Sequence, residues 1–182
     1  MHTLNGYGGF FHTTNATTPS IMSNNVSRII GEISPTNSTV SKYFTLTKIS
    51  SFTPLSGECY YNVARMVREN GGEPVFGWML WESTNLIEGE AHCLYRSPEG
   101  IVTDITPRVS GETEIFFVED SKARPKLSFS SEYGFRISQI TNPQLDIASG
   151  KFSPSIRREG RFNPKEIKVI DLNQYLDSFL FE

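Results

Sequence analysis

Three residues in this sequence have side chains that together could cleave or transfer an amide: Cys59, His92 and Asp104. A thiol can attack a carbonyl carbon, an imidazole can take the thiol proton and return it to the leaving group, and a carboxylate can fix the imidazole tautomer. The backbone N–H of Cys59 would help to bind the oxyanion that forms. The residue types therefore predict a thiol acyl-transfer site, provided that the fold brings them together.

Cys59 stands near the start of a predicted amphipathic helix in the stretch SGECYYNVARMVRENGG, residues 56–72. Ser56 is the expected N-cap, and Gly71 with Gly72 is the expected stop, because glycine readily adopts the left-handed conformation that ends helices. Cys59 would then lie in the first turn, where unpaired N–H groups and the helix dipole lower a thiol pKa. The alternative is that Cys59 is a small, buried structural residue.

The stretches EAHCLY and VTDITP, which carry His92 and Asp104, are predicted to be the two strands of a hairpin. The intervening RSPEG fits a type I turn followed by a bulge at its glycine. That loop pairs Ser97 with Ile101. It places His92 and Asp104 on one face as diagonal neighbours, within reach of a hydrogen bond, and directs Cys93 to the other face.

Five short segments follow one another in the chain: CYYNV, GWMLWES, EAHCLY, GIVTDITP and EIFFVED. They resemble the transglutaminase-like branch of the papain-like cysteine enzymes, and more narrowly a group of bacterial and phage proteins with GWxxWE and DITP motifs. The resemblance covers residues 57–120. It implies a papain-like/transglutaminase-like core with Cys59, His92 and Asp104 as catalytic triad. The implied activity is that of a peptidase, a deamidase or a transglutaminase-like enzyme acting on a protein or peptide amide.

The expected fold is α+β, with the helix that carries Cys59 packed on an antiparallel sheet. Strands are predicted near 75–81, 91–96 and 101–106, and later strands are expected to extend the same sheet. The stretch 126–140 reads as a hairpin, and 167–181 as a strand followed by a short helix.

Other conspicuous residues have two interpretations each. Trp78 and Trp81 could line the substrate cleft, although aromatic residues on strands more often belong to the core. Glu90 could orient a polar group near the cleft, although a solvated carboxylate at a strand end is expected. Asn62, one turn after Cys59, could serve an oxyanion site, although a structural use is expected.

Two other functions remain open. A zinc site could use Cys59, His92, Cys93 or Asp104, but zinc takes three or four converging ligands, and neighbouring strand residues point in opposite directions. The second alternative is a non-catalytic binding or inhibitor module on the same fold. The acyl-transfer interpretation requires neither a metal nor a cofactor.

The whole chain limits the choice of partners. Its 182 residues predict a single domain over 1–182, with a loose N-terminal segment over 1–55 that has a strand or two, and a catalytic core over 56–120. A net charge of -3 provides no basic field for nucleic acid, and no apolar run suits a membrane helix. Two cysteines and no recognisable signal peptide favour a cytoplasmic protein.

Overall fold

The computed structural model describes residues 16–34, 41–108, 111–124, 126–130, 134–140, 143–153 and 157–161. In chain order its elements are α1 Asn24–Ile33, β1 Ser41–Thr45, α2 Cys59–Asn70, β2 Glu73–Glu82, β3 Leu86–Arg96, β4 Val102–Thr103, β5 Glu114–Glu119, the 3-10 helix η1 Ser121–Ala123, β6 Lys126–Ser130, β7 Gly134–Ile140, β8 Gln144–Asp146, β9 Phe152–Ser153 and β10 Arg157–Arg161. The predicted α+β class is confirmed.

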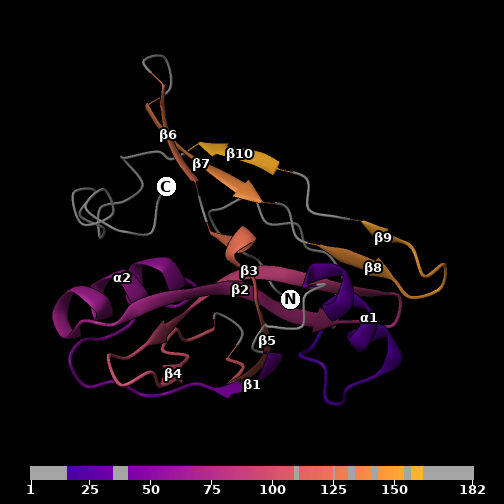
Figure 1. Ribbon diagram of the computed structural model, residues 1–182, viewed down its shortest axis with the longest axis horizontal. Coiled ribbons are helices and arrows are strands. Elements are labelled where there is room, and N and C mark those ends of the chain that lie inside the picture. The colour runs from indigo at the N-terminus through magenta and orange to yellow at the C-terminus, as the bar shows by residue number, and fades with distance from the viewer. Residues whose placement is uncertain are drawn as a thin grey trace.

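A seven-stranded antiparallel sheet forms the main layer of the fold, with strand order β1-β5-β2-β3-β8-β9 and with β4 attached to β3 (Figure 1). Its centre is the long β2–β3 hairpin, paired from Glu73 with Arg96 to Glu82 with Ile87. β2 occupies one edge of β3 along this whole length. β4 and β8 pair with β3 at its two ends, so they lie along its other edge with residues 89–94 between them.

Both helices cover the same face of this sheet, which we call the helical face, at opposite ends of the β2–β3 hairpin (Figure 1). α1 packs its buried Val26 and Ile29 in a cluster with Trp78 of β2. α2 packs Val63 in a cluster with Cys93 of β3. The register pairs Trp78 with Ala91, and strand side chains alternate between faces, so the two clusters share one side of the sheet.

The opposite face, which we call the His92 face, carries a second apolar cluster. It joins β1, β2, β3 and β5 through Phe44, Met79, Leu94 and Phe117. The ring of His92 lies edge-on to Phe117, with the ring centroids 6.3 Å apart. Apolar burial on both faces explains why the central strands read as nearly continuous hydrophobic runs.

The C-terminal third departs from the prediction. The hairpin expected over 126–140 is confirmed as β6 and β7, with Ser130 opposite Gly134. These strands do not extend the main sheet, because β7 takes β10 as its other partner and the three form a separate sheet (Figure 1). Of the strands after β5 that the structure describes, β8 and β9 join the main sheet and β6, β7 and β10 do not. The strand and helix predicted over 167–181 lie outside the described residues.

The described part of the N-terminal segment, residues 16–34 and 41–55, is more ordered than its composition suggests. The expected strand is present as β1, but the helix α1 was not predicted. Ser23 caps α1 by accepting a hydrogen bond at Oγ from the Val26 backbone N–H at 3.1 Å. Apolar residues at helical spacing then bury one stripe on the sheet. A high content of Asn, Ser and Thr concealed this short amphipathic pattern.

The end of α2 agrees with the prediction and its start does not. Gly71 follows the helix with φ 74° and Gly72 has φ 88°, so the glycine stop is confirmed. The helix begins at Cys59 with Glu58 as N-cap, so the prediction of Ser56 as cap was wrong. The reason is Gly57, whose φ of 76° and hydrogen bond from its N–H to the Pro107 carbonyl keep this segment in a turn.

Candidate active site

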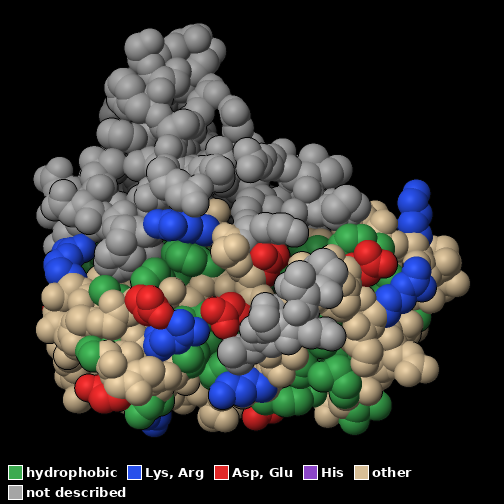
Figure 2. Space-filling view, viewed as in Figure 1, with side chains coloured by type: hydrophobic (Ala, Val, Ile, Leu, Met, Phe, Trp, Pro, Cys, Tyr) green, Lys and Arg blue, Asp and Glu red, His purple; other side chains and the backbone are tan. Residues whose placement is uncertain are grey.

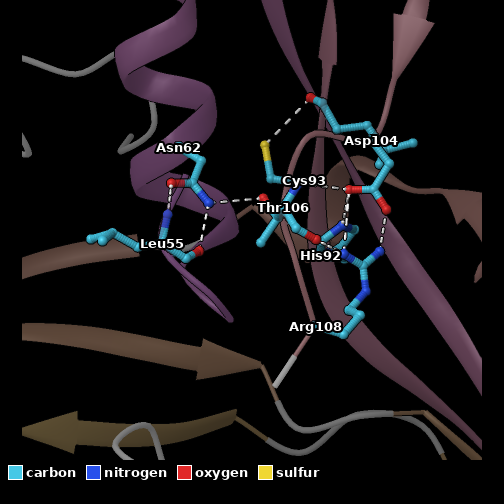
Figure 3. Close-up of polar contacts among 8 residues, drawn as sticks. Leu55, Asn62, His92, Cys93, Asp104, Thr106 and Arg108 are labelled. Atoms are coloured by element: carbon cyan, nitrogen blue, oxygen red, sulfur yellow. Dashed lines mark hydrogen bonds and ion pairs between the residues drawn. The ribbon is translucent and has the colours of Figure 1, made fainter. Parts of the chain in front are cut away.

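The hairpin that carries His92 and Asp104 has the predicted register. The Ser97 N–H donates to the Ile101 carbonyl at 2.9 Å, and Tyr95 pairs with Thr103. His92 and Asp104 consequently lie on one face, with His92 Nε2 at 3.3 Å from Asp104 Oδ1 (Figure 3). Both side chains are almost fully buried. The predicted pairing of the imidazole with the carboxylate is confirmed.

Arg108 completes this buried group and was not predicted (Figure 3). Its Nη2 contacts Asp104 Oδ2, its Nη1 lies 3.4 Å from Asp104 Oδ1, and the same Nη1 donates to the Thr106 carbonyl. The signal in the sequence was a cation four residues after the predicted acid. A strand running straight through residue 106 would not have turned the guanidinium back onto the carboxylate.

The turn that brings Arg108 back begins at Asp104 itself. The Thr106 N–H donates to Asp104 Oδ1 at 3.2 Å, a local side-chain to backbone bond of the kind that competes with strand pairing. The predicted strand over 101–106 is therefore only β4, Val102–Thr103. Pro107, which lacks an N–H, follows in the same turn.

The charges of this group depend on one another. Burial alone would raise the pKa of Asp104, but the charges and hydrogen bonds of His92 and Arg108 outweigh burial and lower it to about 2. Burial lowers the pKa of His92, and the Arg108 charge lowers it further, against the opposing effect of Asp104. At neutral pH the group is therefore a carboxylate held between a guanidinium and a neutral imidazole.

Cys59 is the first residue of α2 and is buried on the helical face, in a cluster with Cys93 and Tyr95. Burial raises the pKa of the Cys59 thiol to about 12, although the backbone N–H of Cys93 and the charge of Arg108 act in the opposite direction. The expectation that the helix start lowers this pKa was therefore wrong. Loss of solvation outweighs the helix N-terminus when a thiol is enclosed by apolar side chains.

His92 contacts Asp104, whereas Cys59 packs with Cys93, the residue that follows His92 in β3. Cys59 lies with Cys93 on the helical face, whereas His92 projects onto the other face. Among the described residues, no side-chain hydrogen bond joins Cys59 to His92. Cys59 and His92 therefore lie on opposite sides of β3.

Asn62 links the start of α2 to the turn after Asp104 (Figure 3). It is fully buried, exchanges two hydrogen bonds with the Leu55 backbone at 2.8 and 2.9 Å, and donates from Nδ2 to Thr106 Oγ1 at 3.1 Å. Its expected structural use is confirmed. Every polar atom of the amide has a partner, so this contact specifies how the helix and the turn are placed.

The two tryptophans occupy different environments. Trp78 is buried in the core of the helical face and donates to Asp120 Oδ2 at 2.9 Å. Trp81 is half-buried on the His92 face and donates to Glu90 Oε2 at 2.7 Å. The expectation of a solvated Glu90 at a strand end was wrong, because Glu90 lies inside β3, is only partly exposed and accepts this hydrogen bond. Burial raises the pKa of its carboxyl to about 7.

On the face shown in Figure 2, acidic and basic side chains of the described residues are interspersed, and no described histidine reaches that surface. The described residues contain no cluster of three or more His, Cys, Asp or Glu placed to hold a metal ion. No helix in the described part of the chain is both long and apolar enough to span a bilayer.

Comparison with known proteins gave no match to any family model, curated protein or solved structure.

Proposed function

We propose that this chain is a thiol-dependent acyl-transfer or amide-hydrolysing enzyme in which Cys59, His92 and Asp104 act as a triad. The observation that carries the proposal is the buried pair of His92 Nε2 and Asp104 Oδ1. This bond leaves His92 Nδ1 without a hydrogen-bond partner among the described residues. Cys59 lies beside the backbone of Cys93, the residue that follows His92.

The proposed reaction begins with the neutral thiol. The Cys59 sulfur attacks the carbonyl carbon of a peptide or protein amide as its proton passes to His92 Nδ1. The oxyanion accepts a hydrogen bond from the Cys59 N–H, which has no partner within the helix. His92 then returns the proton to the leaving amine, and the C–N bond breaks to give a thioester. Water or a second amine resolves the thioester and regenerates the thiol.

Asp104 has a positioning role in this reaction. An ionised carboxylate at Nε2 keeps the ring proton on that nitrogen, so the lone pair of Nδ1 is available as the base. The same charge stabilises the imidazolium that forms during attack. Because Cys59 and His92 lie on opposite sides of β3, this mechanism requires the start of α2 or the edge of β3 to move before the thiol reaches Nδ1.

Acylation by p-nitrophenyl acetate, a small activated ester, tests the proposal without knowledge of the natural substrate. We expect an acetyl adduct on Cys59 by intact mass and peptide mapping. Cys59→Ser should abolish the thioester adduct, and Cys93→Ser, the matched control in the same cluster, should retain it. His92→Gln should slow acylation by about 10²- to 10⁴-fold, the usual contribution of a general base.

A second candidate function is a non-catalytic binding or inhibitor module on the same fold. The observation that favours it is the burial of Cys59 together with its raised pKa. A module of this kind would leave Cys59 unmodified by the ester, or modified no faster than Cys93. Either result with folded protein would decide against the enzyme.

The natural substrate is proposed only by class, as a protein or peptide amide. Acyl-enzyme trapped on Cys59 from a cell extract would report it, because the mass of the adduct identifies the acyl group. Trp81 is the better placed of the two tryptophans to contact a substrate, since it is half-buried on the His92 face while Trp78 belongs to the core.

A further inference from the structure

Arg108 is the group in the site that the triad does not explain. Its side chain is only 7% exposed, and both of its terminal nitrogens contact Asp104. A buried ion pair of this kind is costly to form, since two charges lose their hydration, and it often contributes little to stability. Its placement on the carboxylate that orients His92 therefore calls for a functional account.

We propose that Arg108 is a positioning residue that anchors Asp104 through this buried ion pair and keeps the imidazole of His92 neutral at neutral pH. This inference rests on the proposed function and deepens it. In the resting site Asp104 shares its charge between Arg108 and the Nε2–H of His92. The base at Nδ1 is then free to take the thiol proton during attack, and no thiolate–imidazolium pair exists beforehand.

The geometry explains how one carboxylate serves both partners. Asp104 Oδ2 is directed to Arg108 Nη2, while Oδ1 is the oxygen nearest His92 Nε2. The Thr106 N–H and the Thr106 carbonyl bind Asp104 and Arg108 respectively, which fixes both in the same turn. A carboxylate without the guanidinium would favour a protonated ring much more strongly, because a buried negative charge then has only the imidazole to neutralise it.

The other ionisable groups around His92 do not replace Arg108. Arg108 supplies the positive charge that acts on the ring. The other described strand cations on the His92 face are Lys42 of β1 and Arg96 of β3. The other ionisable strand groups on that face are Glu73 on β2, Glu88, Glu90 and Arg96 on β3, Glu119 on β5 and Lys42 on β1, with Glu112 ahead of β5. Glu58 and Cys59 lie at the start of α2 on the other face. Glu119 already pairs with Arg96 at 3.4 Å.

The test is an NMR titration of His92 in the full chain with labelled imidazole nitrogens, assigned by the loss of its signals in His92→Gln. Arg108→Gln removes the charge and keeps a planar hydrogen-bonding group, and Arg108→Lys keeps the charge. We expect Arg108→Gln to raise the pKa of His92 by on the order of one pH unit or more. Arg108→Lys should leave it within a few tenths of a unit. The wild-type ring should be neutral at pH 6.5, with its proton on Nε2.

Equal titration of His92 in both variants, or no change in either, would overturn the proposal, since a merely structural arginine has no charge-specific effect. The wild-type protein gives an independent check if Arg108→Gln does not fold: a ring protonated at pH 6.5, or a neutral ring with its proton on Nδ1, would also overturn it. The expected titrations together with failure of Cys59 to acylate would contradict the proposed enzyme and leave the role of Arg108 standing.

Discussion

Asn62 donates to Thr106 Oγ1 at 3.1 Å, and this bond ties the helix that begins with Cys59 to the turn that begins with Asp104. The same amide exchanges two hydrogen bonds with the Leu55 backbone, so the loop before the helix is fixed as well. The buried amide of Asn62 therefore links the helix start and the turn after Asp104, two parts of the proposed site that are far apart in the sequence.

We expect Asn62→Ala to lower the free energy of unfolding by about 2 to 3 kcal/mol, because truncation leaves buried backbone and hydroxyl groups without partners. Urea denaturation measures this. Asn70→Ala is the matched control on the same helix, since Asn70 is exposed and bonds only within its own turn and to Met66; its cost should be below about 0.5 kcal/mol. Equal costs for the two variants would contradict the bridging role.

Gly77 is directly opposite His92 in the β2–β3 register, and it has no room for a side chain. A Cβ there would overlap the Val118 carbonyl and the Phe117 ring. Gly77→Ala should therefore cost about 1 to 3 kcal/mol and slow acylation of Cys59, because the strands beside His92 must shift.

Gly31→Ala serves as the control for that substitution. Gly31 lies in α1 with no atom within 4 Å of the Cβ position. Alanine there should stabilise the protein by about 0.5 to 1 kcal/mol through helix propensity, with acylation unchanged. Thermal and urea unfolding distinguish the two outcomes. An unchanged free energy of unfolding in Gly77→Ala would contradict the expectation, because it would show that the strands around residue 77 can separate enough to accept a methyl group.

The pairing of His92 with Asp104 could be predicted from the sequence because turn chemistry fixes strand parity. The glycine bulge in RSPEG determines which residues share a face, whatever the rest of the fold does. Arg108 could not be predicted in this way. Its position depends on a side-chain to backbone bond at Asp104 that ends the strand, and such local bonds compete with strand pairing on nearly equal terms.

The environment of Cys59 also depended on tertiary structure. The sequence indicated a helix start, which favours a thiolate, but the balance is decided by which side chains enclose the sulfur. Those side chains come from β3 and from the loop before the helix, as the cluster of Cys59 with Phe52, Cys93 and Tyr95 shows. A pattern read along one element cannot supply that information.

Acid should destabilise the protein through Asp104. Its folded-state pKa of about 2 lies below the ordinary value of 3.8, so its contribution is fully present above about pH 4 and is lost as the pH falls toward 2. The loss should be about 2 kcal/mol in the free energy of unfolding. Denaturation of wild-type protein and Asp104→Asn across this range checks the effect.

Asp104→Asn should be less stable than wild type at pH 7 by about 3 to 5 kcal/mol, since Arg108 keeps a buried charge without a full partner. The difference should shrink below pH 3. Asp146→Asn is the control for an exposed aspartate, because hydrogen bonds from the Ser149 N–H and hydroxyl lower the pKa of its carboxyl without a buried ion pair. A pH profile for Asp104→Asn that parallels wild type throughout would contradict the assignment.

Glu90 should give the opposite dependence on pH. Burial raises its pKa to about 7 in the folded state, whereas an unfolded chain releases this proton near 4.5. The folded protein therefore holds a proton that the unfolded chain has lost, and the free energy of unfolding should decrease as the pH rises from about 4.5 to 7, by up to about 3 kcal/mol.

Glu90→Gln can still accept the hydrogen bond from Trp81. It should remove this dependence and be more stable than wild type at pH 8, with little difference at pH 4.5. Glu32→Gln on the exposed side of α1 should keep the wild-type profile. If Glu90→Gln were less stable than wild type at pH 8, the ionised carboxylate would be the form that the fold requires, and the direction of this shift would be wrong.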